Sequence, residues 1–416
     1  MKAAVITIGD EILLGQVVDT NSAWLGQRLS ELGIQLQEIM SCSDNEEHII
    51  SAMDRARSLA DFIFMTGGLG PTKDDITKNT LVKYFDTTLE LNEEVWEKIK
   101  SYFAKRGREV LEINRSQAMI PKDCIMLPNE RGTAQGMWFE KHGKVFVSMP
   151  GVPHEMKHIM EERVIPMLRK RYTLPPLVHR VVMTAGVGES MIAAKLSEFE
   201  KSLPGHFKLA YLPDLGIVRL RLTAKGHNPD LPTQADHYAA QMAALLGNWV
   251  YAMQDEKLEV SIGKLLCQHS ATLSCAESCT GGYIAHLLTS VPGSSAYFEG
   301  SMVTYSYAQK EALLGVGRET LQTYGAVSEE CVREMLTGLL QRTNTTYGIA
   351  VSGIAGPTGD TPDKPVGTVW IAVGDIQRQI ARRYQFFRGR AENIRVFAYT
   401  ALNMLRLFIQ GDLHQH

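Results

Sequence analysis

The heptapeptide Ala-Glu-Ser-Cys-Thr-Gly-Gly at residues 276–282 places the hydroxyl of Ser278 on a glycine-containing turn. The preceding residues, 271–275, are typical of a short buried strand, and residues 283–288 repeat apolar side chains at helical spacing. A helix N-terminus offers unpaired N–H groups and the positive end of its dipole, which can hold a phosphate or an oxyanion beside a nucleophile. Because Ser and Thr are also ordinary N-cap residues, the pattern alone leaves a capping role open for Ser278.

A glycine-rich loop near the N-terminus is the second candidate site. Residues 62–65 predict a buried strand, and the loop 66–75 that follows leads into a predicted helix. Glycine lets the backbone approach a ligand closely, and the N–H groups of such a loop can bind phosphate oxygens. The loop residues that we expect to contact a ligand are Gly67, Gly68, Gly70 and Thr72.

Carboxylates accompany this loop. Asp74 and Asp75 end it, while Asp10 and Glu11 follow the first predicted strand, where ligands of open α/β sheets usually bind. Hard divalent cations take carboxylate oxygen and bridge to phosphate, so these four residues are candidate ligands of Mg²⁺ or a similar cation. Capping of the following helix is the alternative role for Asp74 and Asp75.

Composition and charge narrow the class of protein. The 416 residues are 44% hydrophobic with a formal net charge of −3, which is typical of a globular chain of about three domains and makes nucleic acid an unexpected partner. Six scattered cysteines without a CxxC pair predict reduced thiols rather than a disulfide framework or a zinc site. No run of eighteen apolar residues occurs, and Asp10 and Glu11 interrupt the N-terminal apolar stretch, so we expect a cytoplasmic protein without a membrane segment.

Residues 1–172 alternate strand-like and helix-like segments, which is the pattern of a parallel sheet covered by helices. Asp44 with Glu47 predicts a capping box for the second helix, and Gly33 is a good C′ residue for the first. The predicted strands are 3–8, 34–40, 61–65 and 145–148, and the predicted helices are 21–32, 46–60 and one that ends near 171.

Two further domains are predicted. Residues 173–254 predict a small α+β domain with an alternating strand at 216–222 and helices at 191–201 and 234–246. Residues 255–412 predict a third domain of the α/β class. Its predicted strands are 271–275, one within 297–305, 347–352, 366–373 and 379–387, and its predicted helices begin at 283, 308, 328 and 392.

Several motifs occur in the order typical of one family. Residues 9–21, 66–75 and 150–156 resemble the molybdopterin-binding-like domain of the CinA family, competence/damage-inducible protein A. The middle domain resembles the KH-like module of that family, and the third domain resembles its nicotinamide-nucleotide amidase domain. The matching segments of the third domain are 276–282, 304–310, 324–328, 352–357 and 364–370.

For the third domain the resemblance implies hydrolysis of nicotinamide mononucleotide to nicotinate mononucleotide and ammonia, without a cofactor. It implies that Ser278 is the nucleophile and Lys310 its base, and Tyr305 could orient the lysine or the ligand. A lysine acts as a base only where its surroundings lower its pKa, whereas the local pattern alone predicts a solvated helix position for Lys310 and a half-buried strand position for Tyr305. The residues expected to bind substrate are Thr280, Gly281 and Gly282 through backbone N–H groups, and Ser352, Gly353, Gly356 and, with a shifted register, Arg390 around the phosphate.

For the first domain the resemblance implies a metal-dependent ADP-ribose pyrophosphatase, although the family commonly has proline where this chain has Gln135. The alternatives are a pterin or nucleotide binder without turnover, and an interaction protein in DNA uptake or repair. The middle module lacks the GxxG clamp of RNA-binding KH domains, so we expect a spacer or dimerisation element in a homodimer.

Overall fold

The computed structural model describes residues 1–72, 75–174, 177–226 and 228–413. They form two compact units, Met1–Leu177 with Lys225–Asn228, and Val178–Ala224 with Pro229–His416. None of the helices in the described part of the chain combines the length and the apolar composition needed to span a bilayer.

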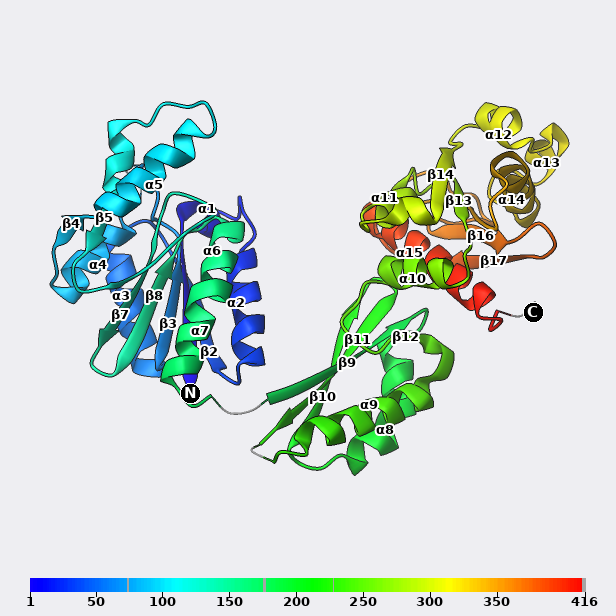
Figure 1. The fold of residues 1–416 in the computed structure, drawn as a ribbon. Helices are drawn as coiled ribbons and strands as arrows, with labels where there is room; N and C mark the ends of the chain where they lie inside the picture. Colours follow the sequence, from blue (N-terminus) through cyan, green and yellow to red (C-terminus); the bar gives the residue numbers. More distant parts are fainter. Residues whose placement is uncertain (73–74, 175–176, 227, 414–416) are drawn as a thin grey trace. The chain divides into compact units, whose positions relative to one another are not determined.

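A six-stranded sheet in the order β2-β1-β3-β8-β7-β6 organises the first unit (Figure 1). The first four strands are parallel, β7 is antiparallel to β8, and β6 is antiparallel to β7. The predicted alternation of strands and helices in the parallel part is confirmed. The strand bounds are β1 Lys2–Ile8, β2 Gln35–Cys42, β3 Phe62–Thr66, β6 Ile125–Leu127, β7 Gly136–Lys141 and β8 Lys144–Met149.

Helices cover both faces of this sheet (Figure 1). On one face, α2 (Thr20–Glu31) and the run α6 (Pro153–Ile159), η2 (Met160–Val164) and α7 (Ile165–Arg171) bury their apolar side chains against the strands. On the other face, α3 (Glu46–Leu59) and α4 (Thr77–Phe85) do the same. The remaining elements are α1 Asp10–Leu13, β4 Leu89–Leu91, α5 Glu93–Ala104, η1 Glu112–Ala118 and β5 Met119–Pro121.

Two local predictions about helix ends have different outcomes. Gly33 takes a left-handed conformation with φ of 76° after α2, as predicted for a C′ residue. The predicted capping box of α3 is wrong, because Asn45 is the N-cap and accepts the N–H groups of Glu47 and His48. The carboxylate of Asp44 instead accepts the N–H of Asp10, which links the ends of β1 and β2.

The second unit begins with the small α+β domain. Its sheet has the order β10-β11-β9-β12, and α8 and α9 pack their apolar side chains against it. The element bounds are β9 Leu177–Ala185, α8 Glu189–Ser202, β10 Phe207–Asp214, β11 Ile217–Lys225, α9 Leu231–Leu246, η3 Gly247–Trp249 and β12 Val250–Ala252.

The rest of the second unit holds a five-stranded sheet in the order β14-β13-β15-β16-β17 (Figure 1). Strands β14, β13 and β15 are parallel, so their carboxyl ends lie at one edge, whereas β16 is antiparallel to β15 and β17 is antiparallel to β16. The strand bounds are β13 Leu273–Glu277, β14 Phe298–Val303, β15 Tyr347–Gly353, β16 Thr368–Gly374 and β17 Gln379–Gln385.

Each face of this sheet carries its own helices. Helices α10 (Leu258–Gln268), α11 (Tyr283–Thr289) and α15 (Arg390–Ile409) bury apolar side chains on one face. The other face is covered mainly by α14 (Glu329–Thr343), with contributions from the ends of α12 (Tyr307–Leu314) and α13 (Arg318–Thr323). A short η4, Ser294–Ala296, precedes β14.

Candidate functional site

Ser278 and Lys310 meet at the carboxyl edge of the second sheet. Ser278 directly follows β13 and α11 begins at Tyr283, so the predicted strand-to-helix turn is confirmed. The Ser278 N–H donates to the carbonyl of Val351 on β15 at 3.0 Å, which fixes the turn against the neighbouring strand. From α12, the Nζ atom of Lys310 lies 2.9 Å from the Ser278 Oγ atom.

Lys310 is 1% exposed, so the solvated position predicted from its local pattern is wrong. Its Nζ atom also donates to the carbonyls of Thr304 at 2.7 Å and Tyr305 at 3.5 Å, beyond the end of β14. Burial lowers the pKa of Lys310, because a charged ammonium loses solvation there. Among the described residues, no carboxylate lies within ion-pair distance of the Lys310 Nζ atom, so no ion pair raises this pKa again.

A cavity of about 220 Å³ opens beside this pair. Ser352 lies at the carboxyl end of β15, and its buried hydroxyl has no hydrogen-bond partner in the described part of the chain. An unpartnered buried hydroxyl beside a cavity is available to a ligand. The predicted site residues that line the cavity are Ser278, Lys310, Tyr305, Ser352, Gly353, Gly356 and Arg390, and the described lining contains no carboxylate.

Arg390 supplies the second positive charge of the lining. Its Nη1 atom donates to the carbonyl of Gly356 at 2.7 Å, and its Nη2 atom donates to the phenol oxygen of Tyr305 at 3.1 Å. Tyr305 is 61% exposed and contacts the arginine through its phenol oxygen. It therefore does not take the half-buried strand position that its local pattern predicts. The nearby Arg395 pairs with Asp214 at 3.5 Å instead.

Glu277, to which the sequence assigned no role, is a fully buried carboxylate next to the nucleophile candidate. It accepts the N–H groups of Gly282, Ile284 and Ala285 and the hydroxyl of Ser301, at 2.9 to 3.1 Å. The partial positive charge at the start of α11 is therefore offset by a carboxylate of the chain itself.

This arrangement corrects the predicted oxyanion site. The N–H of Gly282 cannot stabilise an oxyanion, because it donates to Glu277, and the N–H of Gly281 donates to the Ser278 carbonyl at 3.1 Å. Thr280, Gly281 and Gly282 are also not among the residues that line the cavity, whereas Cys279 is. Within the described residues, the N–H of Cys279 donates to no backbone or side-chain oxygen, and Cys279 lines the cavity, so this N–H is the donor left for that role.

The neighbouring thiol is a poor competitor for Ser278. Cys279 is 6% exposed, and burial raises its pKa to about 12. The thiolate is the nucleophilic form of cysteine, so this thiol is almost entirely unreactive at neutral pH.

The glycine loop of the first unit borders a larger cavity of about 600 Å³. Asp44 and Glu155, which the sequence did not predict as site residues, also contribute carboxylates to its lining, and Asp10 is not part of it. Asp74 lies outside the described residues. The predicted residues that line this cavity are Gly67, Gly68, Gly70, Thr72, Glu11 and Asp75.

Asp75 folds the loop rather than capping α4. Its Oδ1 atom accepts the N–H of Gly70 at 2.7 Å, and its Oδ2 atom accepts the N–H and the hydroxyl of Thr72. Ile76 occupies the N-cap position of α4, so the predicted capping role of Asp75 is wrong. Its oxygens are engaged within the loop, which makes it a weak candidate for a metal ligand.

Negative charge nevertheless accumulates at this cavity. Burial raises the pKa of Asp44, and the nearby carboxylates of Asp10, Glu11 and Asp75 raise it further. The described lining contains no Lys or Arg to offset them. No three metal-ligating side chains converge among the described residues, so a cation here would need oxygens from its ligand or from outside the described chain.

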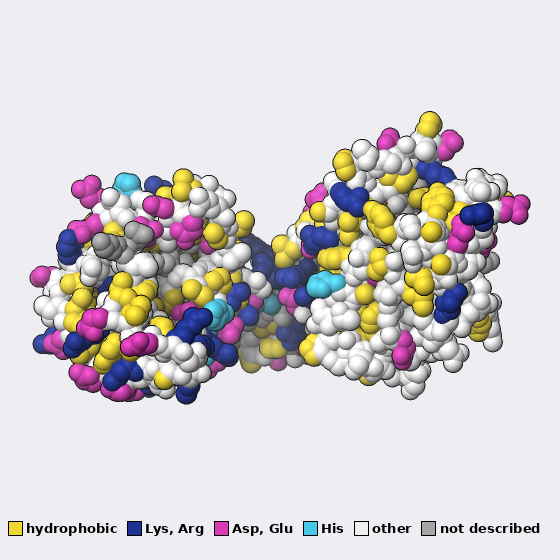
Figure 2. Space-filling view, turned by 90° about the horizontal axis from the view of Figure 1, so that it is seen from above, with side chains coloured by type: hydrophobic (Ala, Val, Ile, Leu, Met, Phe, Trp, Pro, Cys, Tyr) yellow, Lys and Arg dark blue, Asp and Glu magenta, His cyan; other side chains and the backbone are white. Residues whose placement is uncertain are grey.

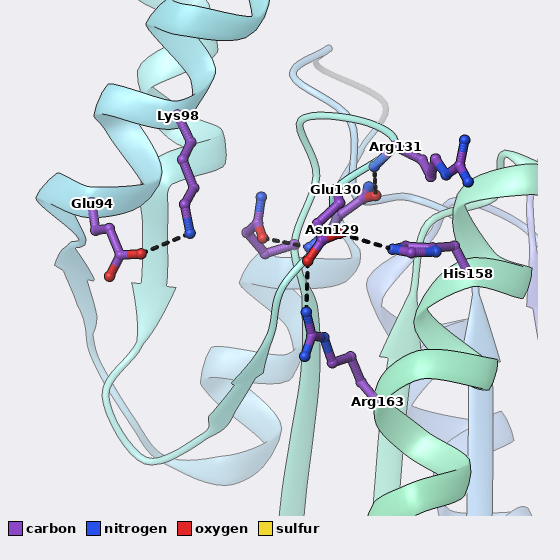
Figure 3. Close-up of polar contacts among 8 residues, drawn as sticks. Glu94, Lys98, Asn129, Glu130, Arg131, His158 and Arg163 are labelled. Carbon is purple, nitrogen blue, oxygen red and sulfur yellow. Dashed lines mark hydrogen bonds and ion pairs between the residues drawn. The ribbon is translucent and has the colours of Figure 1, made fainter.

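Gln135, which stands where the family commonly has proline, holds the loop that carries Asn129. Its Oε1 atom accepts the Asn129 N–H at 2.9 Å, and Asn129 in turn donates to Glu155 at 2.6 Å. Figure 3 shows the neighbouring Glu130 between Arg163 and His158, with the Arg163 ion pair at 2.7 Å. These contacts fix Glu155 at the cavity, and burial raises the pKa of that carboxyl.

Comparisons with known proteins cover all three domains. Residues 4–170 match the family model described as Probable molybdopterin binding domain, residues 179–252 match Damage-inducible protein CinA KH domain, and residues 255–409 match CinA C-terminal domain. A CinA-like protein of Cytophaga hutchinsonii is 44% identical over 405 residues, which cover 97% of both chains. A CinA-like protein of Chloroherpeton thalassium is 42% identical over 422 residues, covering 99% of this chain and 100% of the relative.

Among solved structures, the competence/damage inducible protein CihA of Agrobacterium tumefaciens is 39% identical and matches 37% of this chain and 93% of its own, with a TM-score of 0.36. The predicted fold class is confirmed by the three family models, namely a molybdopterin-binding-like α/β domain, a small KH-like domain and a C-terminal α/β domain. With relatives of 40% identity and more along nearly its entire length, the chain belongs to the CinA family.

Proposed function

We propose that the C-terminal domain is a serine amidase that hydrolyses nicotinamide mononucleotide to nicotinate mononucleotide and ammonia. The observation that carries the proposal is the 2.9 Å contact between the Nζ atom of the buried Lys310 and the Oγ atom of Ser278, both of which line the cavity. Serine at its ordinary pKa is a weak nucleophile, and a lysine whose pKa is lowered by burial can remove its proton.

The proposed reaction uses the pair twice. Neutral Lys310 takes the hydroxyl proton as the Ser278 Oγ atom bonds to the carboxamide carbon, and the ammonium that forms is stabilised by the carbonyls of Thr304 and Tyr305. The tetrahedral oxyanion accepts a hydrogen bond from the N–H of Cys279, which lines the cavity. Lys310 then protonates the leaving nitrogen, ammonia departs, and water, deprotonated by the same lysine, releases the carboxylate from the ester.

The phosphate of the substrate is assigned to Arg390. Its guanidinium lines the cavity from the start of α15, and planar guanidinium groups bind phosphate through paired hydrogen bonds. The lining holds the cations Lys310 and Arg390. Among the described residues it holds no carboxylate, so no negative charge of the lining repels an anionic substrate.

Ammonia release from nicotinamide mononucleotide by the purified full chain tests this function. We expect Ser278→Ala to abolish release and Cys279→Ala to retain it, with Ser290→Ala, an exposed serine at the end of α11, as the matched control. Loss of activity in Cys279→Ala together with normal activity in Ser278→Ala would reject the serine mechanism.

A second activity is proposed for the first unit, namely cleavage of ADP-ribose to AMP and ribose 5-phosphate with a divalent cation such as Mg²⁺. The carboxylate-rich lining of the 600 Å³ cavity supports it, because a bound pyrophosphate would require a cation to offset Glu11, Asp44 and Glu155. We assign the cation to Glu11 and Asp44, because both line the cavity and their carboxylates are close enough to interact. Comparing ADP-ribose cleavage with and without Mg²⁺ separates this activity from pterin or nucleotide binding without turnover.

A role as an interaction protein in DNA uptake or repair is less well supported. On the face shown in Figure 2, acidic and basic side chains are mixed. Nucleic-acid binding proteins usually gather Lys and Arg into a continuous patch. We retain the homodimer as a prediction, which sedimentation of the purified chain would test.

A further inference from the structure

We infer that the second unit holds a separate binding site for a small organic cation, in a cavity between the KH-like domain and the C-terminal domain. The cavity has a volume of about 530 Å³, within the range of small-molecule sites. Strands β10 and β11 supply one wall, and the start of α10 and Tyr399 of α15 supply the other. None of its lining residues belongs to the amidase cavity, so the inference does not rest on the proposed function.

Glu259 is the residue that indicates the charge of the ligand. It lies in the first turn of α10, lines the cavity and is 2% exposed. Its Oε2 atom is buried and has no hydrogen-bond partner among the described residues. A buried carboxylate without a partner is costly, and a cationic ligand would offset that cost.

The other carboxylates of the lining are already neutralised. Asp255 pairs with Arg219 at 3.2 Å, and Asp214 pairs with Arg395 at 3.5 Å. Glu256 accepts the ammonium of Lys264 and the hydroxyl of Ser261. Among the described residues, Glu259 is therefore the buried carboxylate of this lining without an ion pair, while the cation Lys257 in the lining is exposed.

Three tyrosines lie near this carboxylate. Tyr251 and Tyr399 line the cavity, and burial together with the nearby Glu259 carboxylate raises the pKa of Tyr399 to about 12. Tyr297, whose buried hydroxyl has no partner within the described chain, also lies near Glu259. A carboxylate beside aromatic rings is the combination that recognises ammonium groups, through cation–π attraction and a charge-assisted hydrogen bond.

Calorimetric titration of the full chain with 2-phenylethylammonium chloride and with 2-phenylethanol tests the inference, because the two probes share their shape and differ in charge. We expect the ammonium to bind at least about tenfold more tightly than the alcohol. Glu259→Gln should remove that difference, and Glu319→Gln, an exposed glutamate on α13, should retain it.

Equal affinity of the two probes, or an unchanged preference in Glu259→Gln, would overturn the site. Competition by KCl but not by tetramethylammonium chloride at equal ionic strength would indicate an inorganic cation and would also overturn it. The comparison of the two probes on the unmodified chain keeps the test valid if Glu259→Gln fails to fold.

Discussion

The cavity beside Ser278 and the cavity beside the glycine loop both lie where parallel strands end, yet their linings carry opposite charges. Lys310 and Arg390 line the first, whereas Glu11, Asp44, Asp75 and Glu155 contribute carboxylates to the second. The first cavity holds a buried lysine in contact with a serine hydroxyl, and the second has carboxylates beside the glycine loop. The same kind of sheet edge can therefore suit two kinds of reaction, one performed by side chains alone, as we propose for the first cavity, and one that calls for a cation, as we propose for the second.

The largest expected effect concerns Lys310, the proposed base of the first cavity. Lys310→Met should lower kcat/KM for amide hydrolysis at least about 10³-fold, as Ser278→Ala does, because nucleophile and base act as one unit. The double variant should be no slower than either single variant. Ammonia release measures this, with Lys98→Met, an exposed lysine on α5, as the control. Normal turnover in Lys310→Met would remove the lysine from the mechanism.

Chelation of divalent cations should affect the reaction proposed for the second cavity and leave that of the first unchanged. EDTA is expected to slow ADP-ribose cleavage on the order of 10²-fold or more and to leave ammonia release unchanged, because a cation offsets the charge of a cleaved pyrophosphate. Asp44→Asn should slow ADP-ribose cleavage and leave ammonia release unchanged. Asp86→Asn should affect neither reaction, because Asp86 is exposed and Asn tolerates its left-handed backbone. An amidase that stops in EDTA and recovers with Mg²⁺ would contradict the comparison.

The pH dependence of stability provides a test that needs no substrate. Burial lowers the pKa of Lys310 in the folded chain below its ordinary value of 10.5, so the unfolded chain binds the proton more tightly. The resulting destabilisation is fully present below the folded pKa and disappears as the pH rises to 10.5. The unmodified chain should therefore gain stability relative to Lys310→Met between pH 7 and 10.5. The difference in free energy of unfolding, variant minus unmodified chain, should fall over this range.

Urea unfolding at a series of pH values measures this difference, and Lys98→Met supplies the baseline for an exposed lysine. A difference that stays constant over this range would mean that Lys310 keeps its ordinary pKa in the folded chain.

The smallest expected effect concerns the hydrogen bond between Tyr305 and Arg390. Tyr305→Phe removes the phenol oxygen that accepts from the guanidinium at 3.1 Å, so Arg390 is less well oriented. We expect KM for nicotinamide mononucleotide to rise about two- to fivefold with little change in kcat, since an exposed hydrogen bond contributes little net energy. Tyr324→Phe, also exposed, is the control. A large fall in kcat would give Tyr305 a part in the chemical step.

Much of the fold follows from local sequence patterns. The alternation of β1, α2, β2, α3 and β3 was predicted because each element is amphipathic or apolar over its full length. Helix α10 and strands β9, β10 and β12 were not predicted. Strand β12 has only three residues, and the burial of β9 depends on partners distant in the sequence.

The candidate site was predictable in part. The turn carrying Ser278 follows from its glycines and the flanking apolar runs, but the burial of Lys310 does not, because α12 is short and mostly exposed and the lysine is enclosed by segments from other elements. Asp44 and Glu155 reach the first cavity from segments far apart in the sequence. A carboxylate placed five residues before Gly282, the N-cap of α11, was the one available signal for Glu277.

The buried carboxylate of Glu277 has a consequence for the rigidity of the turn that carries Ser278. Its oxygens accept three N–H groups at the start of α11 and the hydroxyl of Ser301 on β14, so one side chain ties the end of β13 to two neighbouring elements. Opening this turn would leave a buried carboxylate without partners, which is costly. The amide hydrogens of Gly282, Ile284 and Ala285 should therefore exchange with solvent slowly even when no ligand is bound.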